Sequence, residues 1–214
     1  MKIYSLKGDI RLLSGLHIGG GDDVMKIGGI DNQIIKDANS GRPYIPASSL
    51  KGKIRSLLEW DLGLVGLDQD KKGAPFSYKN IERAKDRKSA EILLKLFGDS
   101  DVKENKFGIT RISFSDCRIS PESEDKILSE AKYENIIDRQ KGTAEHPRQS
   151  ERVPEGIKFC YDFKIKVLEG DDIDDFKKLI KRGLNLLEND YLGGSGSRGY
   201  GRVEFSNKDE WVEK

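Results

Sequence analysis

The strongest strand pattern in the chain is IKFCYDFKIKV, residues 157–167. Its apolar side chains occupy every second position, and this period places them on one face of a β-strand. The next segment, 171–189, has apolar residues at helical spacing, namely Ile173, Phe176, Leu179, Ile180, Leu184 and Leu187. Acidic residues in its first turn complement the positive end of the helix dipole. We therefore predict a long strand followed by an amphipathic helix at the centre of the fold.

The same two patterns recur toward the ends of the chain. Strands are predicted at the N-terminus, with the apolar face Tyr4, Leu6, Ile10 and Leu12, at about 109–119, and at 199–205. A helix begins near Pro46 and carries Leu50, Ile54, Leu57, Leu58 and Leu62, and a shorter helix covers 90–97. Without its insertions the chain has the order β-α-β-β-α-β. This order predicts an α+β, ferredoxin-like fold, a four-stranded antiparallel sheet with two helices on one face, as in RNA-recognition folds.

Three insertions, at about 19–45, 65–107 and 120–155, exceed ordinary loop lengths and are expected to be functional. We interpret residues 1–214 as a single domain that carries them. Lys and Arg number 38 against 37 Asp and Glu, for a net charge of +1, so any nucleic-acid binding must use a local basic patch. No apolar run approaches membrane-spanning length and no signal peptide is expected. Two cysteines cannot form a disulfide framework, which favours a reducing cytoplasm.

Two basic, glycine-rich segments are the main functional signal, IPASSLKGKIR at 45–55 and LGGSGSRGYGR at 192–202. Small residues let backbone N–H groups approach phosphate oxygens, and Lys and Arg add charge. Two such segments in one small domain indicate a polyanion. The candidate contacts are Ser48, Ser49, Lys51, Lys53, Arg55, Gly193, Gly194, Ser195, Gly196 and Arg198. In the alternative, the serines only cap a helix, the cations are solvated and the second segment is a flexible turn.

The second segment matches G-x-G-x-x-G at 194–199, but a dinucleotide fingerprint needs a strand before it and a helix after it. Here the predicted order is reversed, which excludes that interpretation. The segment GLHIGGG, residues 15–21, adds a flexible loop with His17, Gly19 and Gly20, where the histidine either is structural or faces a ligand. Asp31, in an apolar and glycine-rich stretch, either binds a metal ion, orients a hydroxyl group or caps a turn.

Residues 135–153 mix apolar and basic side chains, which suits a hairpin that inserts an apolar tip between bases. Its apolar members are Ile136, Ile137 and Pro147, and its cations are Arg139, Lys141, Arg148 and Arg152. The alternative is a solvated loop, which three acidic residues in the segment support.

Six motifs together carry a family resemblance: GLHIGGG (15–21), GGID (28–31), IPASSLKGKIR (45–55), LFGD (96–99), PRQSERV (147–153) and LENDYLGGSGSRGYGR (187–202). In this order they resemble the repeated backbone subunit of type III-A CRISPR effector complexes, within the RAMP superfamily. The resemblance implies a palm with lid and thumb insertions, and copies that stack along a guide RNA. It also implies metal-dependent cleavage of the bound target RNA, with Asp31 as the catalytic and metal-binding residue and magnesium as the expected ion.

The resemblance further assigns guide binding to His17, Lys53 and Arg139, with Lys51, Arg55 and Arg198 as phosphate contacts. Ala47 stands where a glycine is usual, and Asn32-Gln33 replaces the usual Ser-Pro after the aspartate. Expected partners are guide RNA, target RNA, further copies of the chain, and other type III-A subunits including the large polymerase-like and the small subunit, with no membrane. The rival hypotheses are a non-catalytic scaffold, a guide-processing endoribonuclease of the same superfamily and a small-molecule sensor.

Overall fold

The computed structural model of the protein describes residues 1–20, 32–68, 73–99 and 106–214. Its sheet is built around two long antiparallel strands, β1 (Lys2–Leu12) and β6 (Lys158–Val167). The shorter strands are β2 (Ile112–Phe114) and β3 (Arg118–Ile119), which pair with β6, and β7 (Val203–Phe205) and β8 (Trp211–Glu213), which pair with β1. The order β2-β6-β1-β7 is the ferredoxin-like order, so the predicted fold class is confirmed.

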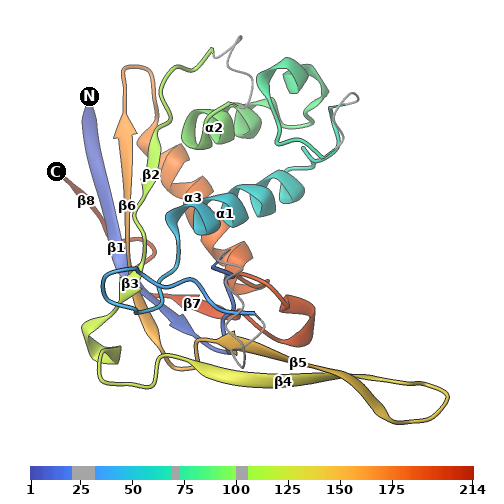
Figure 1. Ribbon diagram of the computed structural model, residues 1–214. Helices are drawn as coiled ribbons and strands as arrows, with labels where there is room; N and C mark the ends of the chain where they lie inside the picture. Colours follow the sequence, from blue (N-terminus) through green and yellow to red (C-terminus); the bar gives the residue numbers. More distant parts are fainter. Residues whose placement is uncertain (21–31, 69–72, 100–105) are drawn as a thin grey trace.

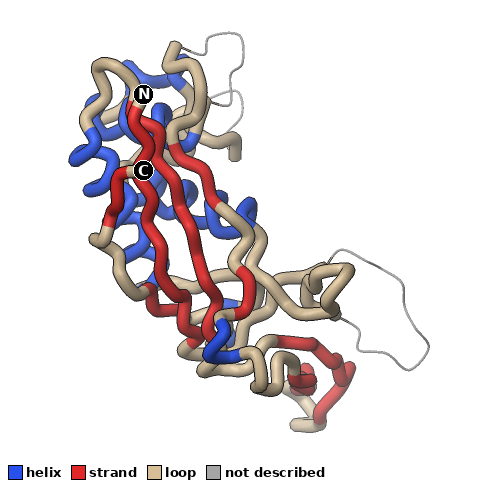
Figure 2. The backbone as a smooth tube through the Cα atoms, turned by 90° about the vertical axis from the view of Figure 1, so that its left-hand side faces the viewer, coloured by secondary structure: helices blue, strands red, loops and turns tan. Residues whose placement is uncertain are grey.

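Three α-helices lie on one side of this sheet and leave the other face open to view (Figures 1 and 2). They are α1 (Ala47–Asp61), α2 (Arg87–Phe97) and α3 (Ile173–Glu188). The core lies between helices and sheet, where Phe159 and Phe163 of β6 are fully buried. Burial of each such side chain contributes about 1.5–3 kcal/mol. Helices α1 and α3 pack closely at Gly183, where an added Cβ would lie 2.7 Å from Ile54.

The predicted strand at 109–119 is interrupted. Cys117 exchanges both of its backbone hydrogen bonds with Ile45 instead of β6, which separates β2 from β3. The last predicted strand starts only at Val203, because Gly199 and Gly201 have positive φ and cannot lie in a strand. Strand β8 was not predicted at all. These three differences leave the fold unchanged, since β2 and β7 occupy the expected edges of the sheet and β8 only adds to β1.

The acidic residues at the start of the 171–189 segment bind other groups of the same chain. The Asp172 side chain caps α3, and Asp171 is buried against Arg111, with 2.8 Å between Oδ2 and Nε. Burial raises the pKa of Asp171, but hydrogen bonds from Arg111, Leu168 N–H and Lys95 outweigh it, and the net pKa is lowered. These carboxylates are therefore part of the helix start and core, and Asp171 is not a solvated surface charge.

The insertions extend this core. The segment 120–155 begins with the 3₁₀ turn η3 (Pro121–Ser123) and then forms a hairpin of β4 (Glu130–Ile137) and β5 (Ala144–Arg152), which projects from one end of the sheet (Figure 1). The segment 65–107 contributes the 3₁₀ turn η1 (Tyr78–Arg83) and α2. Within the described ranges, none of the helices combines the length and apolarity needed to span a membrane.

Candidate nucleic-acid interface

Two of the predicted segments, far apart in sequence, touch in the structure. We call residues 15–20 the histidine loop and residues 192–202 the glycine loop. Gly194 N–H donates to the carbonyl of His17 at 2.9 Å, and Gly201 N–H donates to the carbonyl of Gly15 at 2.9 Å. A Cβ at Gly193, where φ is +76°, would lie 2.3 Å from the His17 oxygen. Glycine is therefore required for the loops to approach this closely.

The glycine loop folds into a compact turn around η4 (Gly196–Arg198). Ser195 adopts a left-handed conformation with φ of 62°, and Gly196 packs so tightly on Tyr191 that a Cβ would lie 2.0 Å from its ring. Gly193, Gly194 and Arg198 remain exposed at the surface of the loop. The arrangement presents backbone and one guanidinium to solvent, as a phosphate-binding loop would.

The hairpin reaches the same place through its base. Nδ1 of His17 lies 2.6 Å from the backbone oxygen of Glu151, and Leu16 pairs with Val153. Arg152 packs against Gly15, where a Cβ would lie 2.5 Å from the arginine Cδ, and its guanidinium lies over the Tyr200 ring at 5.1 Å. The structure thus brings together His17, Arg152 and the glycine-loop residues.

The buried side chain of Glu151 fixes this junction. Its carboxylate accepts from Ile34 N–H at 3.1 Å and from Lys36 at 2.5 Å. Burial raises the pKa of Glu151, but hydrogen bonds from Lys36, Ser129 and Ile34 N–H outweigh it, and the net pKa is lowered. Gly19 pairs with Ile34, so the start of the first insertion and its Ile34–Lys36 segment both lie at the hairpin base.

Three of the predicted cations near the glycine loop are held by carboxylates. Lys53 pairs with Asp190 at 2.6 Å and lies 4.0 Å above the Tyr191 ring. The other two pairs are Arg198 with Glu134 at 2.7 Å and Arg152 with Glu130 at 2.6 Å. None of these carboxylates, nor Tyr200, was identified from the sequence, because no local pattern marks a side chain whose partner is distant.

The start of α1 differs from expectation. The N-cap residue is Pro46, and the Ala47 N–H donates to the Asp116 carboxylate at 2.8 Å. Ser48 and Ser49 lie in the first turn and do not cap the helix, so the capping interpretation is wrong. The Ala47 N–H, one of the amides at the helix start that were expected to bind an anion, is therefore occupied by the Asp116 carboxylate. Lys51 nearby is half-buried, and burial followed by the Arg55 charge lowers its pKa.

Arg55 lies apart from the junction. Its guanidinium contacts Glu59 at 2.7 Å and donates to the carbonyls of Gly98 and Phe76 at 3.0 and 2.9 Å. It therefore fastens α1 to the 65–107 insertion. Arg139 is exposed in the turn of the hairpin, and Arg148 is exposed on β5 opposite Glu134. Gly20 is exposed beside Ile34.

Asp31, the predicted catalytic and metal-binding residue, lies outside the described residues. Its neighbour Asn32 is held at the hairpin base, where its carbonyl accepts from Glu151 N–H at 2.9 Å. Among the residues that the structure describes, no three His, Cys, Asp or Glu side chains gather into a metal site. A magnesium site therefore stays a prediction.

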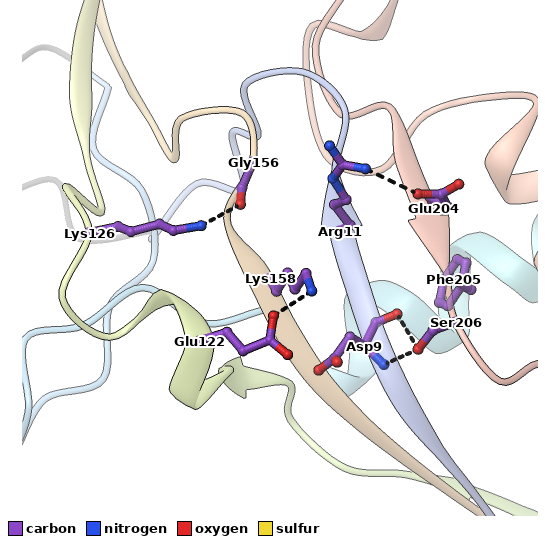
Figure 3. Close-up of a pocket in the computed structure, with 9 residues that line it drawn as sticks. All are labelled: Asp9, Arg11, Glu122, Lys126, Gly156, Lys158, Glu204, Phe205 and Ser206. Carbon is purple, nitrogen blue, oxygen red and sulfur yellow. Dashed lines mark hydrogen bonds and ion pairs between the residues drawn. The ribbon is translucent and has the colours of Figure 1, made fainter.

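The open face of the sheet offers a different surface. A hollow of about 720 Å³ is lined there by side chains of both signs, including Arg11, Lys158, Glu122 and Glu204 (Figure 3). Lys158 pairs with Glu122 at 2.5 Å and Arg11 with Glu204 at 3.8 Å. The one aromatic residue that lines it, Phe205, is buried. Among the described residues that line this hollow, there is no exposed ring of the kind with which sheets of RNA-recognition folds stack bases.

Comparison with known proteins identifies the family. A model described as the RAMP superfamily matches residues 9–204. The chain is 42% identical to the CRISPR system Cms endoribonuclease Csm3 of Methanocaldococcus jannaschii, over 94% of this chain and 77% of the relative. It is 40% identical to the Streptococcus thermophilus protein of that name, over 92% and 84%.

A solved structure leads to the same family. The chain resembles one in the Csm3-Csm4 subcomplex of the type III-A CRISPR-Cas interference complex, with a TM-score of 0.57 and 29% identity over 100% of this chain and 88% of that one. The chain belongs to the RAMP superfamily.

Proposed function

We propose that this member of the RAMP superfamily is the backbone subunit of a type III-A CRISPR ribonucleoprotein, which binds guide RNA along a filament and cleaves the complementary target RNA at regular intervals. The observation that carries the proposal is the junction of three distant segments. Gly194 N–H donates to His17, and His17 in turn donates to Glu151 of the hairpin. The relatives named as Csm3 endoribonucleases support the same conclusion.

The junction is suited to a polyanion. Exposed backbone at Gly193 and Gly194, the guanidiniums of Arg198 and Arg152, and the imidazole of His17 lie on adjoining segments. A chain of phosphates can contact several of these groups at once, and each contact releases counterions. A small-molecule ligand has no use for so extended a set. We include Gly19, Gly20, Ser48, Ser49, Lys51 and Lys53 among the proposed guide contacts, with Arg139 and Arg148 on the hairpin.

The hairpin provides the means to separate bases. The hairpin exposes Tyr133, Ile136 and Ile137 on β4, which are 65%, 52% and 57% exposed. Exposed apolar groups of this kind insert between bases in other nucleic-acid complexes. We propose that the hairpin acts as a thumb and the 65–107 insertion as a lid within a single domain of residues 1–214. The thumb would splay one nucleotide of the guide–target duplex.

Splaying a nucleotide makes cleavage possible. RNA contains its own nucleophile, the 2′-hydroxyl, but a regular helix keeps it out of line with the scissile phosphorus. Releasing one nucleotide permits in-line geometry, a positioning effect of large size. We propose that Asp31 orients this hydroxyl and that a divalent metal, Mg²⁺, supplies charge stabilisation when bound. The expected products are a 2′,3′-cyclic phosphate and a 5′-hydroxyl end.

The proposed partners are guide RNA, target RNA, further copies of the chain, and other type III-A subunits including the large polymerase-like and the small subunit. A stack of identical subunits is a head-to-tail contact that need not close. A net charge of +1 fits such a subunit, because only one face has to meet RNA. We propose the cytoplasm as its location, which its two free cysteines favour.

The test is target-RNA cleavage by the reconstituted complex, with Asp31→Ala, in the presence of Mg²⁺ or of a chelator. Asp37→Asn is the matched control, because Asp37 lies in the same insertion and pairs with Arg118. The proposal predicts that only Asp31→Ala and the chelator abolish cutting, while guide and target binding persist. Unchanged cutting by Asp31→Ala would reject Asp31 as the catalytic residue. Cutting confined to the guide precursor would favour the guide-processing enzyme.

A further inference from the structure

The proposed RNA site carries its own anions. Three cations of the site lie on different segments, namely Lys53, Arg198 and Arg152. Each pairs with a carboxylate that was not among the predicted RNA contacts. The three N···O distances are between 2.6 and 2.7 Å. The same arrangement therefore occurs at three cations around one junction.

Glu134 has the most central place among these carboxylates. It projects from β4 toward the glycine loop, where Oε2 lies 2.7 Å from Arg198 Nη1 and Oε1 accepts from the Tyr200 hydroxyl at 3.2 Å. Lys132 lies 3.7 Å away on the same strand. The carboxylate is 20% exposed, whereas the Arg198 side chain that it holds is 59% exposed. Arg198 therefore binds Glu134 through Nη1 and donates to Ser195 Oγ through Nη2, at 2.5 Å, while more than half of its side chain stays exposed to solvent.

A carboxylate and a phosphate bind the arginine guanidinium in the same way. Both accept paired N–H donors of the guanidinium fork, so a phosphate can take over the position of Glu134 on Arg198. Solvent screens an ion pair whose cation is as exposed as Arg198, so breaking the pair with Glu134 costs little stability. A single phosphate gains little from the exchange. A strand gains at several cations together, and releases counterions at each.

We propose that Glu134 is a specificity-determining residue: it occupies Arg198 in the free protein so that only an anion with several linked phosphates displaces it. This inference rests on the proposed RNA-binding function. It follows from the proposal that single nucleotides and inorganic phosphate bind the site weakly. Glu134 is not a contact to RNA, and its removal should strengthen RNA binding rather than weaken it.

A purely structural role would have the opposite effect. If the pair served only to hold the hairpin against the glycine loop, its loss would loosen the junction and weaken RNA binding. Glu134→Gln separates the two roles, because the amide oxygen still accepts from Tyr200 while the negative charge is lost. Glu204→Gln is the matched control. It removes an equal charge from a Glu–Arg pair on the open face of the sheet.

The experiment measures binding of the purified full chain to a long oligouridine, a uridine dinucleotide and inorganic phosphate. For Glu134→Gln we expect about threefold to tenfold tighter binding of the long strand at about 100 mM salt, from one added favourable charge interaction. We expect a larger relative gain for the dinucleotide, so that the preference for the long strand falls. Glu204→Gln should change binding less than twofold by the same reasoning, since its charge is distant and screened.

Arg198→Gln distinguishes the failure of this inference from the failure of the site. If Arg198→Gln leaves binding of the long strand unchanged, the glycine loop is not the RNA site and the proposed function loses its support there. If Arg198→Gln weakens binding but Glu134→Gln does not strengthen it, the site stands and the role of Glu134 is overturned. Equal strengthening by Glu204→Gln would also overturn it, because the effect would then reflect net charge alone.

Discussion

Nδ1 of His17 lies 2.6 Å from the backbone oxygen of Glu151, 134 residues further along the chain. A carbonyl oxygen only accepts hydrogen bonds, so Nδ1 carries the hydrogen and Nε2 is left for another partner. The bond joins the histidine loop to the hairpin, while the carbonyl of His17 joins it to the glycine loop. One residue therefore links the three segments of the proposed RNA site.

Replacing His17 should weaken RNA binding in two separable ways. His17→Ala removes both the hydrogen bond to the Glu151 backbone oxygen and the free Nε2. We expect about a tenfold loss of affinity for RNA, the size expected for the loss of one hydrogen bond of this kind. His17→Asn can keep a donor toward Glu151 but not Nε2. Fluorescence anisotropy with a labelled single-stranded RNA measures both. If the asparagine variant binds as the wild type does, His17 only anchors the loop and does not contact RNA.

Glu151→Gln should destabilise the protein by about 1–3 kcal/mol at neutral pH, because Lys36 and Ile34 N–H lose a charged acceptor. The folded pKa of Glu151 lies below its ordinary value of 4.5. Its stabilising contribution is therefore complete well above that pH and is lost as the pH falls through the lower folded pKa. Urea unfolding across this range should show the two proteins converging in acid.

The control for that prediction is Glu145→Gln. This residue is half-exposed on the hairpin and lies 3.8 Å from Lys141, so its loss should change stability by less than about 0.5 kcal/mol. A constant difference between wild type and Glu151→Gln down to the lowest pH would contradict the electrostatic explanation.

Two glycines of the glycine loop should respond differently to alanine. A Cβ at Gly201 would lie 1.9 Å from the backbone oxygen of Leu192, which cannot move aside without breaking the loop. We expect Gly201→Ala to cost about 3 kcal/mol or more. Gly199 has a similar positive φ of 86° but open space around it, so only the conformational cost of about 1 kcal/mol applies. Thermal unfolding of both variants measures the difference, and equal losses would mean that backbone strain alone decides.

The exposed isoleucines of the hairpin should matter for cleavage and not for folding. Because Ile136 and Ile137 are mostly exposed, changing both to serine should alter stability by less than about 0.5 kcal/mol. In the reconstituted complex we expect target cleavage to slow by about tenfold or more, since the displaced nucleotide loses its wedge. Ile127→Ser is the control, because Ile127 is 77% exposed and lies outside the hairpin. Normal cleavage by the double variant would exclude the wedge.

The sequence was most informative where a pattern is local. The alternation at 157–167 and the helical spacing at 171–189 correspond to β6 and α3, and the element order was sufficient for the sheet topology. It was least informative where pairing depends on distant residues. Trp211–Glu213 became a strand because the edge of β1 was available to it, and Cys117 left the sheet because Ile45 was its partner.

The candidate site divides in the same way. Residue types alone indicate which segments have the small residues and cations that phosphate binding requires, because that chemistry resides in the side chains and the glycines. The meeting of the histidine loop, the glycine loop and the hairpin base at His17 and Glu151 depends on the folded chain. The fold also directs Arg55 to the carbonyls of Gly98 and Phe76, and it pairs Glu134 with Arg198. A side chain's partners depend on which segments the fold brings within a few ångströms, and no local pattern in the chain contains that distance.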